Sequence, residues 1–557
     1  MKKSIRILLA AVIALVVGAL FFYVSVPAIN VFSQDFWVNL TLLFAAFGIA
    51  YLAIGWKRDL QKLQNKRKFF EGGFSVGKLV VVLAIIPILV LMIGSLISSQ
   101  IFNAAKYSQI ISVEESVFEE DMPETDLITN IALMDSESAN VIGNRTLGAL
   151  SDVVSQYQVN GTYYQINYHG FPEKVSSLEY VDFFRWVNNH ENGIPGYVMV
   201  DPVNSSAEYI RFSTPIKYTD SAYFNEDLHR ALRFSYPTKI FGTFSFEIDE
   251  QGNPFYIVSC MKPKVGLFGA MDVNEVIIFN PCNGESELYA LADVPSWVDN
   301  VFTGYHASEK YDWYGTLKNG YWNSVIGKKD CKVTTDDFGY IMIEDDVWFF
   351  TGVTSVSNDE SNIGFLISNA RTGEYKFYPV IGAEEYSAMA AAEGEVQEKA
   401  YVASFPSLIN VSGEATYIMV LKDSHGIVKL YALVNVENYS IVATGSTQTE
   451  AKEAYMALLL QEGILSGTQP PVQQPEADAG ETTVSATFTV QDIRIVTLSG
   501  NSVMYITADD GVLYKQSIAE NESLMLLNVG DTVQVDYMNT ANEKIRLIRT
   551  VKQITTP

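Results

Sequence analysis

Three long apolar stretches near the N-terminus constrain this chain more than any other feature. They cover roughly Ile7 to Tyr23, Trp37 to Trp56 and Leu79 to Leu96, and none contains a charged residue. Each is ~17 to 20 residues long, the length that a helix needs to cross ~30 Å of hydrocarbon. We therefore predict a membrane domain with three transmembrane helices in residues 1–103.

The distribution of basic residues predicts the orientation of these helices. Residues 1–78 hold 10 Lys and Arg against 3 Asp and Glu, whereas the rest of the chain holds 28 against 61. The basic residues crowd the N-terminus and the loop 57–68, and the loop "NVFSQDF" between the first two stretches has none. By the positive-inside rule the N-terminus is cytoplasmic and residues 104–557 are extracytoplasmic. In the alternative interpretation, the first stretch is a signal peptide.

One local pattern recurs beyond the apolar stretches. Residues 365–394 are typical of a strand, a polar turn, a second strand and an Ala-rich helix, and the turn Asn369–Glu374 matches Asn280–Glu285. Weaker copies of the turn lie at Asp201–Asn204 and Asn435–Asn438. Asn and Gly supply the positive φ that a tight reversal needs, so we interpret the Gly-Glu pair as part of a turn rather than as a site.

A second hairpin precedes each copy of this pattern. Its turns lie at His169–Pro172, Gly252–Pro254, Glu344–Asp346 and Ser412–Glu414. The alternation of apolar and polar residues in the flanking strands predicts sheets with one buried face. The expected unit is therefore four antiparallel strands followed by a helix that covers the apolar face, recurring every ~80 to 90 residues.

The hairpin "IDEQGNPFYIV" followed by "IIFNPCNGESELY" resembles the PepSY domain family over about residues 240 to 300. The family carries an acidic-Gly-x-Pro-aromatic hairpin and then an Asp/Asn-x-x-x-Gly-Glu turn between strands. The sequence pattern differs in one respect, since the helix follows the sheet in each copy, whereas the best-known members place one before it. The resemblance implies small, non-catalytic extracytoplasmic modules that restrain peptidases or contact envelope components.

After residue 461 the composition changes twice. "EGILSGTQPPVQQPEADAGETT" has scarcely an apolar side chain and is typical of a linker. The short alternating strands that follow predict a small all-β barrel, OB-fold-like or SH3-like.

The chain is thus predicted to be α+β, with PepSY-like or cystatin-like repeats. The expected parts are a membrane domain at 1–103, α+β units at 104–235, 236–330, 331–400 and 401–461, a linker at 462–483 and a barrel at 484–557.

Motifs that carry chemistry are scarce. The histidines, at positions 169, 190, 229, 306 and 425, lack the spacing that puts two metal ligands on one helix face, and no C-x-x-C pair, P-loop or Gly-x-Ser-x-Gly elbow occurs. We therefore name no catalytic residue and no cofactor. Acidic clusters at Asp336–Asp337, Asp345–Asp346 and Asp359–Glu360 are either calcium ligands or solvated turns, so the metal content stays open. A disulfide between Cys260 and Cys282 also stays open, with Cys331 left over.

These features favour a non-enzymatic binding or scaffolding protein of a bacterial cell envelope. Its expected partners are the lipid bilayer and another envelope protein or polymer, not nucleic acid. Two alternatives are an inhibitor or chaperone of envelope peptidases, suggested by the PepSY resemblance, and an envelope hydrolase with a dispersed active site.

Overall fold

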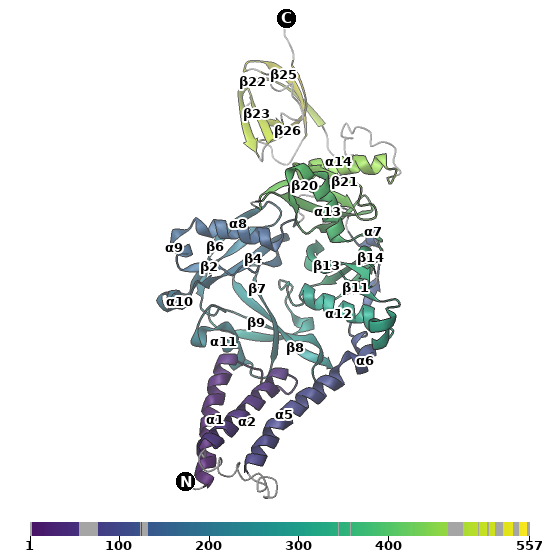
Figure 1. Cartoon of the computed structure of the whole chain (residues 1–557). Helices are drawn as coiled ribbons and strands as arrows, with labels where there is room; N and C mark the ends of the chain where they lie inside the picture. The colour runs from purple at the N-terminus through teal and green to yellow at the C-terminus, as the bar shows by residue number, and fades with distance from the viewer. Residues whose placement is uncertain are drawn as a thin grey trace. The chain divides into compact units, whose positions relative to one another are not determined.

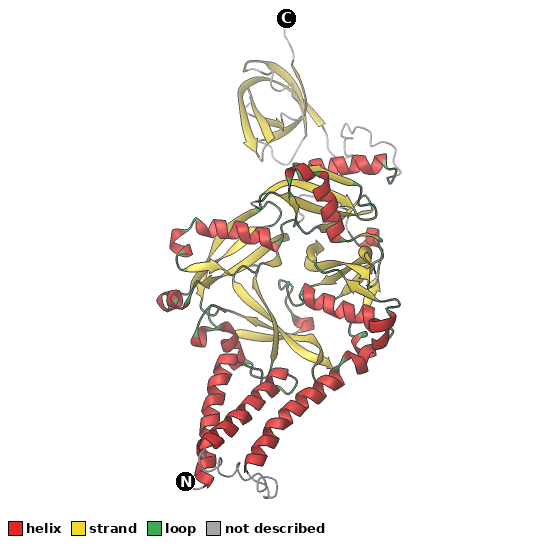
Figure 2. Cartoon of the chain, viewed as in Figure 1, coloured by secondary structure: helices red, strands yellow, loops and turns green. Residues whose placement is uncertain are grey.

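The computed structural model describes residues 3–54, 76–122, 124, 132–343, 345–356, 358–424, 426–465, 483–498, 501–509, 512–517, 527, 529–538 and 545–553. These residues belong to two compact units, Met1–Leu465 and Ser466–Pro557. Helices and mostly antiparallel sheets occur together, which is the predicted α+β class (Figure 2). The predicted cytoplasmic loop 57–68 and most of the predicted linker lie outside the described residues.

Three helices coincide with the apolar stretches: α1 (Lys3–Ser25), α2 (Gln34–Ile54) and α5 (Val76–Ser98) (Figure 1). By length and composition α1 and α2 can each span a membrane. Past Ser98 the chain bends by 49° into α6 (Gln100–Tyr107). The helices α5 and α6 count as a third membrane span only if the bent pair crosses the membrane as a single segment. Two membrane-spanning helices are therefore supported, and the third remains a prediction.

The first sheet is an antiparallel meander that follows α8 (Ser136–Gly148) and α9 (Ser151–Val154). Its strands are β2 (Tyr157–Val159), β3 (Tyr164–Tyr168), β4 (Phe171–Tyr180), β5 (Ile194–Asp201) and β6 (Ser206–Ile216). The order is β2-β4-β5-β6, and β3 also pairs with β4. The short helix α10 (Phe183–Asn189) connects β4 to β5.

The second sheet follows η2 (Phe224–Glu226) and α11 (Leu228–Ser235). Its strands are β7 (Ile240–Ile248), β8 (Pro254–Val265), β9 (Gly269–Phe279) and β10 (Ser286–Ala290), each paired with the next, and η3 (Leu291–Asp293) ends it.

The third sheet follows α12 (Gly304–Leu317) and the π-helical turn η4 (Asn323–Gly327). Its strands are β11 (Lys332–Thr334), β12 (Gly339–Ile343), β13 (Asp346–Ser355), β14 (Asn358–Asn369), β15 (Tyr375–Tyr378) and β16 (Gly382–Ala383). From the segment after α6, β1 (Val113–Glu115) adds to β15 in parallel, and α7 (Phe118–Asp121) follows it.

The fourth sheet follows α13 (Glu385–Glu395) and η5 (Gln397–Lys399) and is followed by α14 (Gln448–Gln461). Its strands are β17 (Val402–Ala403), β18 (Ser407–Val411), β19 (Glu414–Lys422), β20 (Val428–Asn435) and β21 (Val442–Gly445). The order is β17-β19-β20-β21, with β18 also paired with β19.

Both predicted hairpins are present in each of the four sheets. The first hairpins are β3–β4, β7–β8, β12–β13 and β18–β19. The second hairpins are β5–β6, β9–β10, β14–β15 and β20–β21.

In the first, third and fourth sheets, a helix that precedes the sheet in the chain packs on it, which differs from the predicted order. α8 packs on β5 and β6, α12 on β11, and α13 on β19, β20 and β21. The helix predicted after the second sheet, before Phe302, does not form beyond the short η3, and the irregular chain at 294–302 packs on the apolar face of that sheet through Val298, Val301 and Phe302. α14 covers the sheet before it, as predicted, and α13 also shares a core cluster with Phe350, Phe365 and Ile367 of the third sheet. The predicted boundary at 330 falls between α12 and the third sheet, and the boundary at 400 falls between α13 and the fourth.

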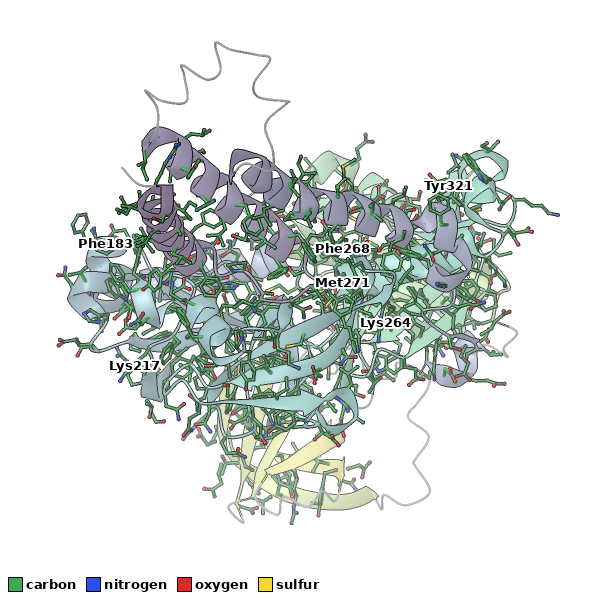
Figure 3. The ribbon with its side chains drawn as sticks, turned by 90° about the horizontal axis from the view of Figure 1, so that it is seen from below. Phe183, Lys217, Lys264, Phe268, Met271 and Tyr321 are labelled. Atoms are coloured by element: carbon green, nitrogen blue, oxygen red, sulfur yellow. The ribbon has the colours of Figure 1, made fainter. Side chains whose placement is uncertain are left out.

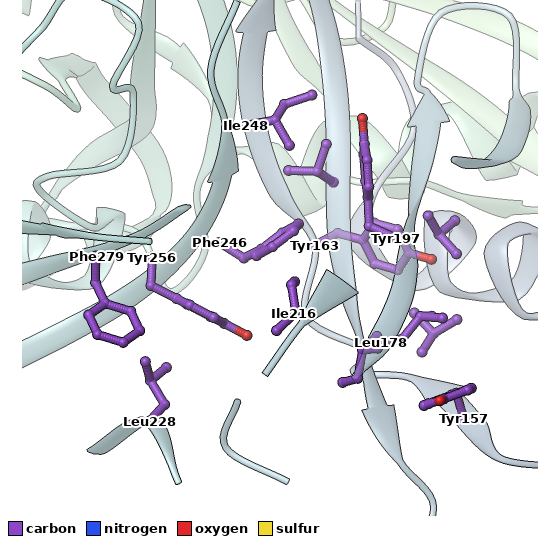
Figure 4. Close-up of a cluster of buried hydrophobic side chains, with 14 of the residues drawn as sticks. Tyr157, Tyr163, Leu178, Tyr197, Ile216, Leu228, Phe246, Ile248, Tyr256 and Phe279 are labelled. Carbon is purple, nitrogen blue, oxygen red and sulfur yellow. The ribbon is translucent and has the colours of Figure 1, made fainter. Parts of the chain in front are cut away.

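The four sheets share their cores in pairs. One cluster joins the first two sheets through side chains that include Tyr197, Phe246, Tyr256 and Phe279 (Figure 4). A second cluster joins the third and fourth sheets, where the rings of Phe365 and Tyr417 lie 5.7 Å apart, edge to face. Fully burying a large apolar side chain contributes roughly 1.5–3 kcal/mol, so these shared cores hold the sheets together.

The C-terminal unit is a closed barrel. Its strands are β22 (Thr483–Leu498), β23 (Asn501–Ala508), β24 (Leu513–Ser517), β25 (Thr532–Met538) and β26 (Ile545–Gln553), in the order β22-β23-β24-β26-β25. Its core includes Phe488, Ile506 and Val533. The prediction of a small all-β barrel is confirmed.

Candidate functional site

The recurring turn has the same hydrogen bonds in the second and third sheets. The N–H of Asn280 donates to the Glu285 carbonyl at 2.8 Å, and that of Asn369 donates to the Glu374 carbonyl at 3.0 Å. The Asn280 side-chain oxygen accepts the Cys282 N–H, and that of Asn369 accepts the N–H groups of Arg371 and Thr372. The glycine has φ of +82° (Gly284) or +75° (Gly373). Such a φ strains residues with a Cβ, so Asn and Gly are required by the turn itself.

A backbone segment, which we call a strap, is fastened to the turn in three of the units. The bonds, of 2.7–3.0 Å, run from Lys217 and Tyr218 to the Pro281 carbonyl, from Val301 and Phe302 to the Ala370 carbonyl, and from Ala383 to the Val436 carbonyl. In every case the acceptor is the residue after the Asn that begins the turn. Since each strap precedes the helix of its unit, it ties the beginning of the unit to its last hairpin.

The surroundings of the two matching turns differ. Beside Asn280 lies a small polar cavity of about 140 Å³, lined by residues that include Thr214, Asn253, Cys282 and Asn283. The Cys282 thiol donates to the Thr214 carbonyl at 3.1 Å, and burial raises the pKa of this thiol to about 11. Cys282 is therefore a protonated thiol at neutral pH and not an activated nucleophile.

Beside the other turn, charged side chains fill the corresponding space. Asn369 donates to Asp346 at 2.8 Å, and the Arg371 guanidinium binds the same carboxylate through two nitrogens. Asp346 belongs to a predicted acidic cluster, and here its carboxylate is bound by an arginine. The carbonyl of its neighbour Asp345 accepts from the Asn167 side chain of the first sheet at 2.8 Å.

Two buried carboxyl groups lie at the start of the second strap. The Glu247 carboxylate accepts the N–H groups of Asp299 and Asn300 at 2.9 and 2.7 Å, and the Asp299 carboxylate accepts the Asn167 N–H at 2.7 Å. Burial raises the pKa of Glu247 to about 7, and burial together with the Glu247 charge raises the pKa of Asp299. Both residues are at most 1% exposed, so this pair joins three sheets and is not open to a substrate.

The remaining predicted acidic residues are dispersed. Asp337 accepts the Phe338 N–H and lies 3.5 Å from the Tyr386 hydroxyl. The side chains of Asp359 and Glu360 lie outside the described part. Within the described ranges, no group of three or more His, Cys, Asp and Glu residues could hold a metal ion.

Four histidines each lie 3.1–3.4 Å from one carboxylate, in the pairs His169–Glu250, His190–Glu226, His229–Asp220 and His306–Asp272. The Asp272 carboxylate also binds Lys310 at 2.9 Å. Burial opposes ionisation of Asp272, but His306 and Lys310 outweigh it and lower the pKa of Asp272 to about 2. His425 is not among the described residues. Cys260, Cys282 and Cys331 are buried free thiols, so the Cys260–Cys282 bridge that the sequence left open is not formed.

Two arginines of α11 fasten the second unit to the end of α1. The Arg230 Nε donates to the Tyr23 carbonyl at 2.9 Å, and the Arg233 Nε donates to the Val26 carbonyl at 2.9 Å. The Arg230 guanidinium also lies 4.4 Å from the centre of the Tyr23 ring. A cation at the C-terminus of a helix satisfies carbonyls that have no partner within the helix and opposes the negative end of its dipole.

A second contact fastens the β8–β9 turn to the end of α5. The Ser98 hydroxyl accepts the N–H groups of Leu267 and Phe268 at 2.8 and 3.0 Å. Gly94, one turn earlier on α5, lies under the Phe268 ring, where an added Cβ would come within 2.5 Å of a ring carbon. Figure 3 labels Phe268 beside these helices. The second sheet is thus fixed to the ends of two apolar helices.

The sequence does not reveal these fastening residues. Arg230 and Arg233 bind backbone carbonyls about 200 residues away, and a carbonyl acceptor leaves no mark in the sequence. Glu247 stands at the polar position of an alternating strand, which predicts exposure, and only the arrival of residues 299 and 300 buries it.

Comparison with known proteins gives no family assignment. No protein-family model matches this chain, and no curated protein matches it.

Proposed function

We propose that this chain is a membrane-anchored extracytoplasmic binding or scaffolding protein of a bacterial cell envelope, without enzymatic activity. The observation that carries the proposal is the double fastening of the second unit, by Arg230 and Arg233 to α1 and by Ser98 to α5. A flexible tether would suffice to keep an enzyme at a membrane. Two rigid contacts instead hold the four sheets in one orientation, which suits a protein that presents surfaces to a partner.

The exposed sheet edges are the surfaces that we propose engage another envelope protein or polymer. β10 is the last strand of the second sheet, and β17 lies at an edge of the fourth. Edge strands present unpaired N–H and C=O groups to which an extended peptide can add. Leu288 on β10 and Val402 on β17 are exposed apolar side chains at these edges.

The C-terminal barrel supports a second binding role. β24 and β26 are parallel neighbours, and the order β22-β23-β24-β26-β25 favours the OB-type alternative over the SH3-like one. OB-type barrels bind oligosaccharides or oligonucleotides through one face and its loops. On the extracytoplasmic side we propose a glycan, a peptide or another part of this chain as its partner, and not nucleic acid.

The alternative of a peptidase inhibitor or chaperone rests on the PepSY resemblance. Stoichiometric slowing of an envelope peptidase by the purified full chain would favour this alternative.

Photo-crosslinking in the native membrane tests the proposal. A photoreactive amino acid replaces Leu288 or Val402, and a matched control replaces Lys62 in the predicted cytoplasmic loop. We expect the two edge positions to capture an envelope protein or polymer that the control does not capture. Identical products at all three positions would contradict the proposal. Turnover of peptide, ester or glycan substrates, abolished by one substitution without unfolding, would establish the hydrolase alternative instead.

A further inference from the structure

Apolar side chains are exposed on the unit beside the end of α1. The exposed set comprises Phe183, Phe184, Val187, Tyr223, Phe224 and Phe234, and we name it the α10–α11 patch. Phe184 is 68% exposed. Large apolar side chains gathered in this way on a protein surface mark an interaction site.

This patch is continuous with the membrane helix. The Phe234 ring lies 6.4 Å from the rings of both Phe22 and Tyr23 in the last turns of α1. Arg230, which binds the Tyr23 carbonyl, also binds the Phe224 carbonyl. The patch then continues from ring to ring, since Trp186 lies 5.6 Å from Phe224 and 5.7 Å from Phe183.

A second exposed apolar group lies beside the end of α5. It consists of Phe102 on α6 and Trp322, Val325 and Ile326 around η4, and we name it the η4 patch. Ile326 is 75% exposed, and the exposed Lys328 and Lys329 follow it after Gly327. Apolar side chains next to lysines are typical of segments that lie in the headgroup region of a bilayer.

The η4 patch is also fixed to the apolar helix α5, through α6. α12, which leads into η4, packs against α6, with the rings of Tyr107 and Trp313 5.0 Å apart. Tyr321, at the start of the patch, packs against the same cluster as Tyr107. Seen from the side of the helices, Phe183 and Tyr321 lie on opposite sides of α1, α2 and α5 (Figure 3).

We propose that both patches rest on the lipid surface of the membrane that α1 and α2 enter. Phe, Tyr and Trp side chains are favoured at the interface, where an apolar body meets the acyl boundary and a polar tip meets water. Each patch is held at the end of an apolar helix by the contacts described above, so it meets the headgroup layer when the helices are inserted. The protein thereby contacts the bilayer surface on both sides of the apolar helices. This lipid contact is additional to the contacts of Arg230, Arg233 and Ser98 at the helix ends.

Depth measurements on the full chain in lipid vesicles test this inference. A spin label is placed on Phe184→Cys or Ile326→Cys. The matched control is Ile381→Cys, a position 72% exposed between β15 and β16 of the third sheet. The three native cysteines are buried, which confines labelling to the introduced site. The vesicles contain phosphatidylglycerol and phosphatidylethanolamine. At each position we compare the ratio of the label's collision rate with oxygen to its collision rate with a water-soluble nickel chelate. We expect this oxygen-to-nickel ratio to be at least threefold higher at positions 184 and 326 than at 381.

Two outcomes would overturn the inference. One is an oxygen-to-nickel ratio at both patch positions equal to that at 381. The other is spin–spin broadening that disappears when labelled chain is diluted with unlabelled chain, while the oxygen-to-nickel ratio stays equal to that at 381. Such broadening would show that the patches contact another copy of the chain rather than lipid. Ile326→Ser and Phe184→Ser in the same vesicles provide a second measurement that needs no label. Each should lower the protection of its own patch against limited proteolysis in vesicles, and an unchanged cleavage rate at both patches would contradict lipid contact.

Discussion

The turns at Asn280–Glu285 and Asn369–Glu374 have nearly the same backbone, yet they lie in different surroundings. Each is closed by the same pair of backbone hydrogen bonds and receives two N–H groups from a strap. The first lies beside a small polar cavity, whereas Asp346 and Arg371 fill the space beside the second. The strap of the first follows the apolar Ile216, but the strap of the second follows two residues held by the buried Glu247.

The two copies share their backbone hydrogen bonds but differ in the side chains around the turn. A turn, a strap and a meander satisfy backbone groups and can be reused with many side chains. The second turn adds polar contacts that join the first three sheets: the buried Glu247 and Asp299, the Asn167 N–H that Asp299 accepts, and the Asp346–Arg371 pair. It is therefore a structural joint, whereas the first turn is the more open of the two.

The largest expected difference between the two straps is in their response to pH. The pKa of Glu247 rises from 4.5 to about 7 on folding, so between these values the folded chain holds a proton that the unfolded chain has released. Stability therefore falls as the pH rises through this window, by about 3 kcal/mol in all at about 1.4 kcal/mol per pH unit. Hydrogen exchange of residues 299–302, corrected for intrinsic rates, should show lower protection at pH 8 than at pH 5.

The first strap is the internal control for this prediction. Residues 217 and 218 follow a buried isoleucine, so their protection should change less over the same pH range. In Glu247→Gln the pH dependence at 299–302 should shrink, although absolute protection falls because an acceptor is lost. Equal protection of 299–302 at both pH values would refute the assignment of this joint as the pH-sensitive one.

The second-largest expected difference is the loss of stability when the turn asparagine is replaced. Asn369 is 2% exposed and makes bonds to Arg371, Thr372 and Asp346, whereas the oxygen of Asn280 accepts the Cys282 N–H. Because buried groups lose their partners, we expect Asn369→Ala to cost about 2 kcal/mol and Asn280→Ala about 1 kcal/mol. Local unfolding free energies from native-state hydrogen exchange would measure both, and a larger cost at Asn280 would reverse the comparison.

The sequence predicts those parts of the fold that depend on neighbouring residues. Alternation and turn residues predict all eight hairpins, because a hairpin is set by local backbone preference. The partner of each helix depends instead on which sheet face is already covered. Val298 and Phe302 occupy the face of the second sheet that a following helix would need, and nothing local to α12 signals this.

The candidate site was predictable only where it is made of turns. The Asn and Gly of the repeat act as expected from their backbone preferences. Arg233 and Glu247 instead bind backbone groups brought from elsewhere in the chain, and their meaning depends on the pairing of sheets and helices. Long-range burial of a polar residue is decided by tertiary packing, which one sequence pattern does not contain.

Replacing the turn glycines should have similar effects in the two copies, and it therefore tests their likeness. At Gly284 an added Cβ would lie 2.9 Å from the Tyr218 ring, and at Gly373 it would lie 3.0 Å from the Phe302 ring. With positive φ in both, Gly284→Ala and Gly373→Ala should each cost about 1 kcal/mol. The same exchange measurement applies, and a difference greater than about 1 kcal/mol would show that the straps are not equivalent.

The smallest expected effect concerns Glu285 and Glu374, the acidic residues after the turn glycines. Both are exposed, and their backbone carbonyls accept the Asn N–H. The Glu285 carboxylate also accepts the Asn283 side-chain amide at 2.7 Å, a bond for which glutamine keeps an acceptor oxygen. Glu285→Gln and Glu374→Gln keep the backbone and the side-chain volume, so each should change stability by less than about 0.5 kcal/mol. Neither should alter crosslinking from Leu288 or Val402. If one substitution abolished partner capture while protection of the turn stayed intact, that carboxylate would be a recognition group in one copy alone, and the two turns would differ in function as well as in surroundings.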